Sequence, residues 1–130
     1  MSSNGSNLKA LRTVCEPRED VVSGGLADNH FAAQLDKVVR DPEHYPVYGD
    51  ASSFFAQSYP TSGLKTLLTK TFGRATGAKG VAGENGVLRP TTSFGGGKTH
   101  GLTAVYHLAK GARPANISEF LNQALLPDGC

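Results

Sequence analysis

The chain has 130 residues, 38 % of them hydrophobic, a proportion compatible with one globular domain rather than with a disordered protein. A net charge of +2, from 13 Lys and Arg against 11 Asp and Glu, is too small to indicate a nucleic-acid-binding face. No apolar run reaches the roughly 18 residues of a membrane helix and no signal peptide is recognisable, so we expect a cytoplasmic protein without a membrane partner.

The N-terminal part predicts a polar tail, an extended segment and one helix. Residues 1–7 are Ser, Asn and Gly with one Met, and they carry too little apolar surface to offset the entropy of ordering them. Residues 8–25 predict an extended stretch broken by turns. Asp28 can cap a helix over about 29–40, because the apolar residues there share one face before Pro42 ends it.

The next segment predicts a loop-rich stretch and then a firm helix. Residues 42–60 are rich in Pro and aromatic residues, with a short helix or turn over 52–58. Thr61 and Ser62 are N-cap candidates for an amphipathic helix of about 12 residues that ends near Gly73. Three aromatic residues of the loop are predicted to belong to the core rather than to a base-stacking platform: Phe54, Phe55 and Tyr59.

The C-terminal part predicts a linker, a strand, a glycine loop and two helices. Residues 77–86 contain four glycines and predict a flexible connection, after which Val87 begins a strand that Pro90 ends early. The helix after the glycine loop runs until Gly111. A further helix begins at the cap Asn116 and continues to Leu125, with Glu119 as a charge in its first turn.

The glycine loop is the one motif that carries chemistry. Glycines let successive backbone N–H groups turn toward phosphates, and the following helix adds its positive end. Lys98 would reach the β- and γ-phosphates of a nucleotide, and the Thr99 hydroxyl would ligate Mg²⁺. The predicted nucleotide-binding residues are Thr92, Ser93, Phe94, Gly95, Gly96, Gly97, Lys98, Thr99 and His100.

Two observations leave a plainer interpretation open. Thr92 stands where the GxxxxGK[ST] pattern has its first glycine, so the loop is a variant. A flexible glycine turn capped by Thr99 would give the same local sequence. The sequence favours neither of two roles for His100, which are contact with the phosphates and an ordinary position in the helix.

No other group of residues forms a recognisable site. Cys15 and Cys130 have no base within sequence reach and predict free thiols. The histidines share no metal-ligand spacing and predict surface or packing positions, His100 apart: His30, His44, His100 and His107.

The loop and its surroundings resemble a known family. The run 92–100 with the helix after it, together with Phe54-Phe55 and residues 59–65, resembles the AAA-like ATPases called domain of unknown function four-nine-nine, found in phage-defence islands. The resemblance covers most of residues 8–129, and the string Phe-Gly-Gly-Gly-Lys-Thr-His is the usual loop of the family, which accounts for the missing first glycine.

The resemblance implies an α/β fold, a partial AAA-like P-loop NTPase core. Strand, phosphate-binding loop and helix would follow a helical N-terminal segment, and the sheet would be incomplete. The tail 1–7 would precede an N-terminal family segment, 8–60, and the start of the ATPase domain, 61–130. By analogy with AAA-type ATPases, residues 59–64 would pack against the adenine.

The expected function is binding of ATP and Mg²⁺ through the variant loop. We expect hydrolysis only in a longer chain, because neither an acidic strand residue nor an arginine finger is recognisable and family members run to many hundreds of residues. The alternative is a truncated non-catalytic remnant or an interaction module. Expected partners are the nucleotide, a second copy or other subunits of a defence complex, and nucleic acid by family analogy alone.

Overall fold

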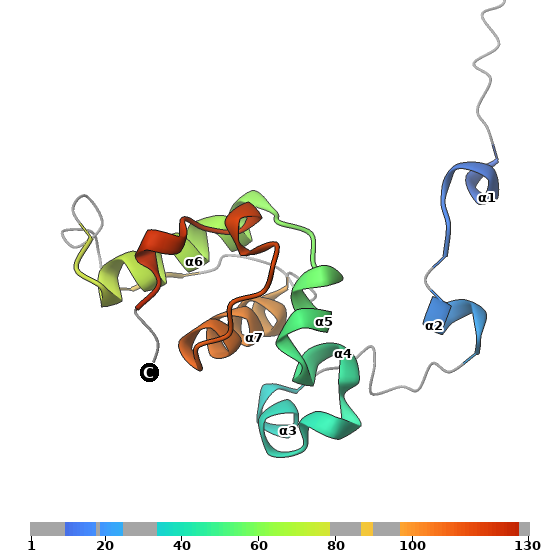
Figure 1. Cartoon of the computed structure of the whole chain (residues 1–130), viewed down its shortest axis with the longest axis horizontal. Coiled ribbons are helices and arrows are strands. Elements are labelled where there is room, and N and C mark those ends of the chain that lie inside the picture. The colour runs from blue at the N-terminus through green and yellow to red at the C-terminus, as the bar shows by residue number, and fades with distance from the viewer. Residues whose placement is uncertain (1–9, 18, 25–33, 79–86, 90–96, 128–130) are drawn as a thin grey trace, which may run out of the picture.

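The computed structural model describes residues 10–17, 19–24, 34–78, 87–89 and 97–127, and its regular structure there is helical (Figure 1). The 3₁₀ helices are labelled η. In chain order the elements are α1 (Leu11–Val14), α2 (Glu19–Val22), α3 (Leu35–Arg40), η2 (Pro42–His44), α4 (Pro46–Gly49), α5 (Ala51–Ala56), α6 (Ser62–Ala75), α7 (Lys98–Ala109), η3 (Ile117–Glu119) and η4 (Gln123–Leu125).

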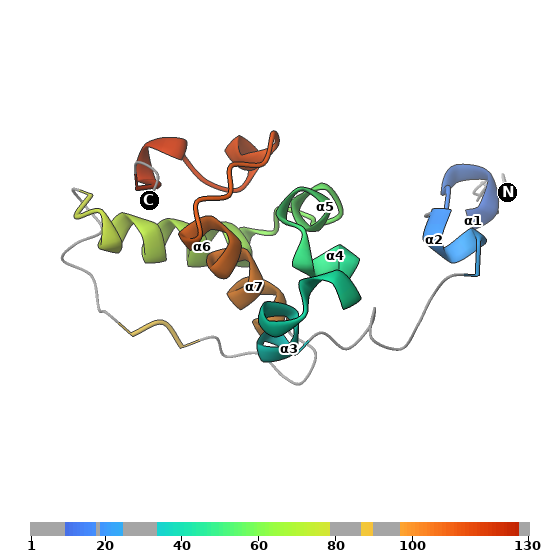
Figure 2. The same cartoon turned by 60° about the horizontal axis from the view of Figure 1, so that its bottom comes forward.

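The two longest helices, α6 and α7, pack against each other and organise the described body (Figures 1 and 2). The short helices α3, α4 and α5 follow one another along one end of α7, and η4 packs on α6. In both views α1 and α2 stand apart from this body. No helix in the described part of the chain has the length and apolar character needed to cross a membrane.

Helix α6 follows directly from its sequence. The Thr61 hydroxyl accepts a hydrogen bond from the Leu64 backbone N–H at 3.2 Å and so satisfies one of the free donors of the first turn. Leu64, Leu68 and Phe72, four residues apart, are all buried on one face. The predicted helix is therefore confirmed, and it extends two residues beyond Gly73.

The core lies where α5, α6, α7 and η3 meet. Phe54 and Phe55 are fully buried at the end of α5, and the Phe55 ring meets Phe120 edge to face with ring centroids 5.1 Å apart. Such an arrangement is favourable for aromatic rings and adds to the free energy gained by burying them. The predicted core position of Phe54 and Phe55 is confirmed, whereas Tyr59 is 79 % exposed and lies outside the core.

The predicted strand at Val87 is wrong, and so is the α/β fold class built on it. Residues 87–89 form no ladder, and Val87 and Leu88 are 71 % and 38 % exposed, whereas a central parallel strand is buried on both faces. No strand occurs anywhere in the described ranges, so they contain no strand–loop–helix core and no partial sheet. Two apolar residues just before Pro90 are too few to form a core strand.

Three other predicted elements differ in detail. Residues 10–24 contain the single-turn helices α1 and α2 where an extended stretch was expected. Helix α3 has Gln34 as its N-cap, and the expected cap Asp28 lies outside the described residues. The predicted C-terminal helix is wrong, and η3 and η4 stand in its place. Asn116 precedes η3 as predicted, but its side chain donates to the Phe55 carbonyl at 3.0 Å and caps no helix.

Candidate functional site

The first turn of α7 is the described part of the predicted phosphate-binding loop. Gly97 immediately precedes the helix with φ 76° and ψ 18°, a left-handed conformation that glycine adopts without steric cost. Lys98 and Thr99 are the first two helical residues, and both are exposed. The other predicted binding residues, Thr92, Ser93, Phe94, Gly95 and Gly96, lie outside the described residues.

A close helix crossing positions this turn beside α6. Gly101 closes the first turn, its N–H donating to the Gly97 carbonyl at 2.9 Å. Gly101 is also buried against α6, where an added Cβ would lie 2.7 Å from the Leu67 side chain. A residue without a side chain at this point lets the start of α7 approach α6 closely.

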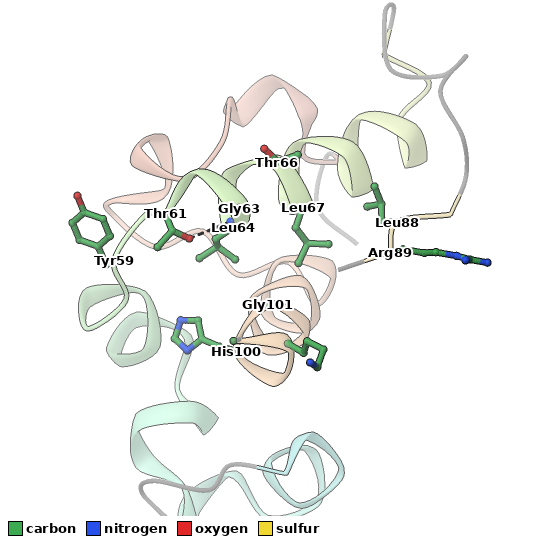
Figure 3. A pocket seen from close by; sticks show the side chains of 12 residues that line it. Tyr59, Thr61, Gly63, Leu64, Thr66, Leu67, Leu88, Arg89, His100 and Gly101 are labelled. Atoms are coloured by element: carbon green, nitrogen blue, oxygen red, sulfur yellow. Dashed lines mark hydrogen bonds between the residues drawn. The ribbon is translucent and has the colours of Figure 1, made fainter. Parts of the chain in front are cut away.

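A cavity of about 560 Å³ opens between the start of α6 and the start of α7 (Figure 3). Leu64 and Leu67 point into this space from α6, and Tyr59 lies at its rim. Its full lining is Tyr59, Thr61, Gly63, Leu64, Thr66, Leu67, Leu88, Arg89, Gly97, Lys98, His100 and Gly101. The structure therefore brings the segment 59–64, expected beside an adenine, to the same cavity as Gly97 and Lys98.

The charged groups at this cavity are basic. Lys98, the first residue of α7, lines the cavity, and so does Arg89, which extends away from the helices in Figure 3. No Asp or Glu belongs to the described lining, so its polar groups besides these cations are hydroxyls, backbone groups and the His100 imidazole. This set of groups is compatible with a ligand that carries negative charge at one end and apolar surface at the other.

His100 joins the cavity to the core. Its Nε2 atom lies 2.9 Å from the Ser58 hydroxyl, and its ring packs on Phe54 with centroids 4.5 Å apart. Burial lowers the pKa of His100 below its ordinary value, because an imidazolium is poorly solvated there.

Of the other histidines and cysteines, those that the structure describes do not line the cavity. His107 is buried in α7 with Nε2 2.6 Å from the Tyr48 carbonyl, a packing role as expected, and His44 is exposed beside Asp41. Cys15 is an exposed free thiol. Within the described ranges, no group of three His, Cys, Asp or Glu residues could hold a metal ion. His30 and Cys130 lie outside those ranges.

Sequence reasoning missed three residues of this region. Arg89 is a basic residue shortly before the glycine loop, but the sequence pattern assigns it only to the predicted strand. Leu67 was recognised only as a residue of an apolar helix face, although it also lines the cavity. Ser58 gave no signal, because its partner His100 is 42 residues away.

The described body is a small group of packed helices. An open cavity lies at the start of α7, directly after Gly97. The chain belongs to the family described as the DUF499 N-terminal domain, whose model matches residues 8–124. No curated protein and no solved structure matches the chain significantly.

Proposed function

We propose that this domain binds a nucleoside triphosphate, ATP, with its phosphates at the start of α7 and its base in the adjoining cavity. The observation that carries the proposal is the cavity itself, which joins residues 59–64 to Gly97 and Lys98. The two segments are more than thirty residues apart in the sequence, and they line the same cavity. Residues 59–64 are the expected contact for the base, by analogy with AAA-type ATPases, and the sequence predicts Gly97 and Lys98 as contacts for the phosphates.

The phosphate end is supported by the geometry of α7. This helix has 12 residues, and its first N–H groups have no partners within the helix, so its N-terminus favours an anion. Lys98 adds a full positive charge at the same point. The glycines of the loop, 95–97, would let the backbone turn around the phosphates.

Mg²⁺ would accompany the nucleotide. A hydroxyl in the first helical turn is a suitable oxygen ligand, and we assign this role to Thr99, next to Lys98. Bound there, the ion would supply positive charge that offsets the charge of the phosphates, and Lys98 of the same turn would bind phosphate oxygens.

The base end is supported by the size and lining of the cavity. About 560 Å³ falls within the range of small-molecule sites, roughly 300–1,000 Å³. Leu64 and Leu67 offer apolar contact to a ring, and the Thr61 hydroxyl stands at the edge, already accepting a hydrogen bond from Leu64 and still able to donate one.

Hydrolysis requires groups beyond this set. A carboxylate that orders Mg²⁺ and the attacking water, and a cation that stabilises the developing charge, are general requirements for phosphoryl transfer. We propose that this domain supplies binding, and that such groups come from elsewhere in a larger ATPase. Service in phage defence rests on the family resemblance alone.

A single substitution tests the binding role. Lys98→Ala should remove measurable Mg-ATP binding in isothermal titration calorimetry, because the phosphate charge loses its main partner. Lys37→Ala, an exposed lysine on α3, is the matched control and should bind as the wild type does. Equal affinity of Lys98→Ala and wild type would contradict the assignment.

A thermal-shift measurement provides an independent check. Nucleotide at a hundred times its Kd should stabilise the wild type by about 2.7 kcal/mol, since it binds only the folded state. Lys98→Ala should show no such shift. If the wild type shows neither a heat of binding nor a thermal shift with nucleotide, the proposal of nucleotide binding is wrong. An interaction module is then the better interpretation.

A further inference from the structure

Two walls of the cavity are joined by one side-chain hydrogen bond. Ser58 immediately precedes Tyr59 at one wall, and His100 immediately follows Thr99 at the other. The Ser58 Oγ to His100 Nε2 distance of 2.9 Å spans 42 residues of sequence. The phosphate-binding turn is therefore tied directly to the C-terminal end of α5.

The direction of this hydrogen bond follows from the serine. The Ser58 hydroxyl has one proton, and at 2.6 Å from the Phe54 carbonyl oxygen it donates that proton there. Toward His100 the hydroxyl can then only accept, so Nε2 carries the hydrogen and donates it. The pair has a defined polarity, from imidazole to hydroxyl to carbonyl.

The ring of His100 is held by packing as well. It lies on Phe54 with an interplanar angle of 34°, and Phe54 is 1 % exposed. The buried Phe54 ring against one face of the imidazole and the hydrogen bond at Nε2 leave the His100 side chain few accessible rotamers. Because His100 is the third residue of α7, fixing its side chain also fixes the backbone that carries Lys98.

We infer that His100 is a positioning residue for the nucleotide: its hydrogen bond to Ser58 sets the first turn of α7 at the distance from residues 59–64 that one bound triphosphate nucleotide requires. His100 itself need not touch the ligand. The inference rests on the proposed function, and it adds that affinity depends on the contact between His100, which lines the cavity, and Ser58, which does not.

Three variants separate positioning from simple stabilisation. Ser58→Ala removes the acceptor, and His100→Phe keeps the ring on Phe54 but removes the donor. His100→Gln is the conservative variant, because its amide N–H can occupy the place of Nε2–H. Ser52→Ala, an exposed serine on α5, is the matched control.

The experiment is calorimetric titration of each full-length variant with Mg-ATP, well below the melting temperature measured without nucleotide. Ser58→Ala and His100→Phe should each weaken binding by about five- to tenfold, the effect of losing one hydrogen bond of ordinary strength. His100→Gln should stay within about twofold of wild type, and the double variant Ser58→Ala/His100→Phe should lose no more than either single variant.

The outcomes distinguish the two proposals. If the wild type binds Mg-ATP and the folded Ser58→Ala and His100→Phe variants bind it equally well, the hydrogen bond is purely structural and the inference fails while the proposed function stands. If the wild type binds no Mg-ATP, both fail. Lowered melting temperatures with unchanged affinity count against positioning, and weakened affinity rescued by His100→Gln supports it.

Discussion

At the scale of single residues, Gly97 determines how α7 begins. Its φ of 76° lies in the left-handed region, which costs a residue with a Cβ roughly 1–2 kcal/mol. No atom of the described residues lies within 4 Å of an added Cβ there, so the expected cost of a substitution is conformational. Gly63 on α6 also has open space around it, but its φ is ordinary.

This contrast gives a paired prediction. Gly97→Ala should lower the free energy of unfolding by about 1–2 kcal/mol, because alanine must adopt the left-handed conformation. Gly63→Ala should leave stability unchanged or raise it by up to about 1 kcal/mol, since alanine favours a helix. Urea denaturation measures both, and equal effects of the two substitutions would argue against a conformational cost at Gly97.

Residues with local roles were the ones that the sequence could predict. Thr61 at the N-cap and Lys98 beside the glycine loop have signals within four residues of themselves, and the structure places both at helix starts. Ser58 contacts His100, and Arg89 lines the cavity, only because the folded chain brings distant segments together. Nucleotide binding by residues 92–100 stays a prediction.

At the scale of elements, α5 depends on a charged cap. The Asp50 carboxylate accepts from the Ser53 backbone N–H at 2.8 Å, and this hydrogen bond, followed by one with the Ser53 hydroxyl, holds the pKa of Asp50 below its ordinary value. A lowered carboxyl pKa means that the cap stabilises the folded state above the unfolded pKa. This stabilisation is lost as the pH falls through the folded pKa.

The contribution of this cap to stability should depend on pH. At neutral pH, Asp50→Ala should destabilise the protein by about 1 kcal/mol through loss of the cap. The difference from wild type should shrink in acid, as the wild-type carboxyl becomes protonated. Asp36→Ala, in the first turn of α3 without a capping hydrogen bond, is the control, and denaturation at both pH values is the measurement.

Helices with a clear hydrophobic periodicity were predicted correctly from the sequence. Elements that depend on contacts with distant parts of the chain were not. Helices α6 and α7 carry their apolar faces and end signals in their own residues. The strand at Val87 was inferred from a short apolar run after the glycine-rich linker, and no partner strand in the described residues pairs with it. A strand needs such a partner, whereas a helix satisfies its own backbone.

At the scale of the whole molecule, the described body is held by hydrogen bonds between distant segments. His107 lies 2.6 Å from the Tyr48 carbonyl, 59 residues away, and the Asn116 amide donates to the Phe55 carbonyl across 61 residues. Both contacts tie the α4–α5 region to the C-terminal part. No local pattern in the sequence predicts them, and for this reason the tertiary arrangement was beyond sequence reasoning.

Asn116 offers the test at this scale. Asn116→Ala should lower the free energy of unfolding by about 1–3 kcal/mol, because the partly buried Phe55 carbonyl loses its side-chain donor. Ser118→Ala, an exposed neighbour in η3, should change it by less than about 0.5 kcal/mol. The free energy of unfolding is measured by thermal or urea denaturation followed by circular dichroism. A neutral Asn116→Ala would show that the Asn116 hydrogen bond is dispensable, because the Phe55 carbonyl keeps the Ser58 backbone N–H as a donor at 3.3 Å.

The distant hydrogen bonds also impose an order on how the protein acquires its structure. Helix α6 forms its bonds within 14 residues and needs no partner from the other end of the chain. The burial of Phe54 and Phe55 depends on contacts with α7 and η3. Loops of 42 to 61 residues must therefore close before these contacts can form. During synthesis on a ribosome, we therefore expect this pair to lack its contacts with His100, His107 and Phe120 until residues 98–120 have emerged. A nascent chain arrested earlier should expose part of this apolar surface to chaperones.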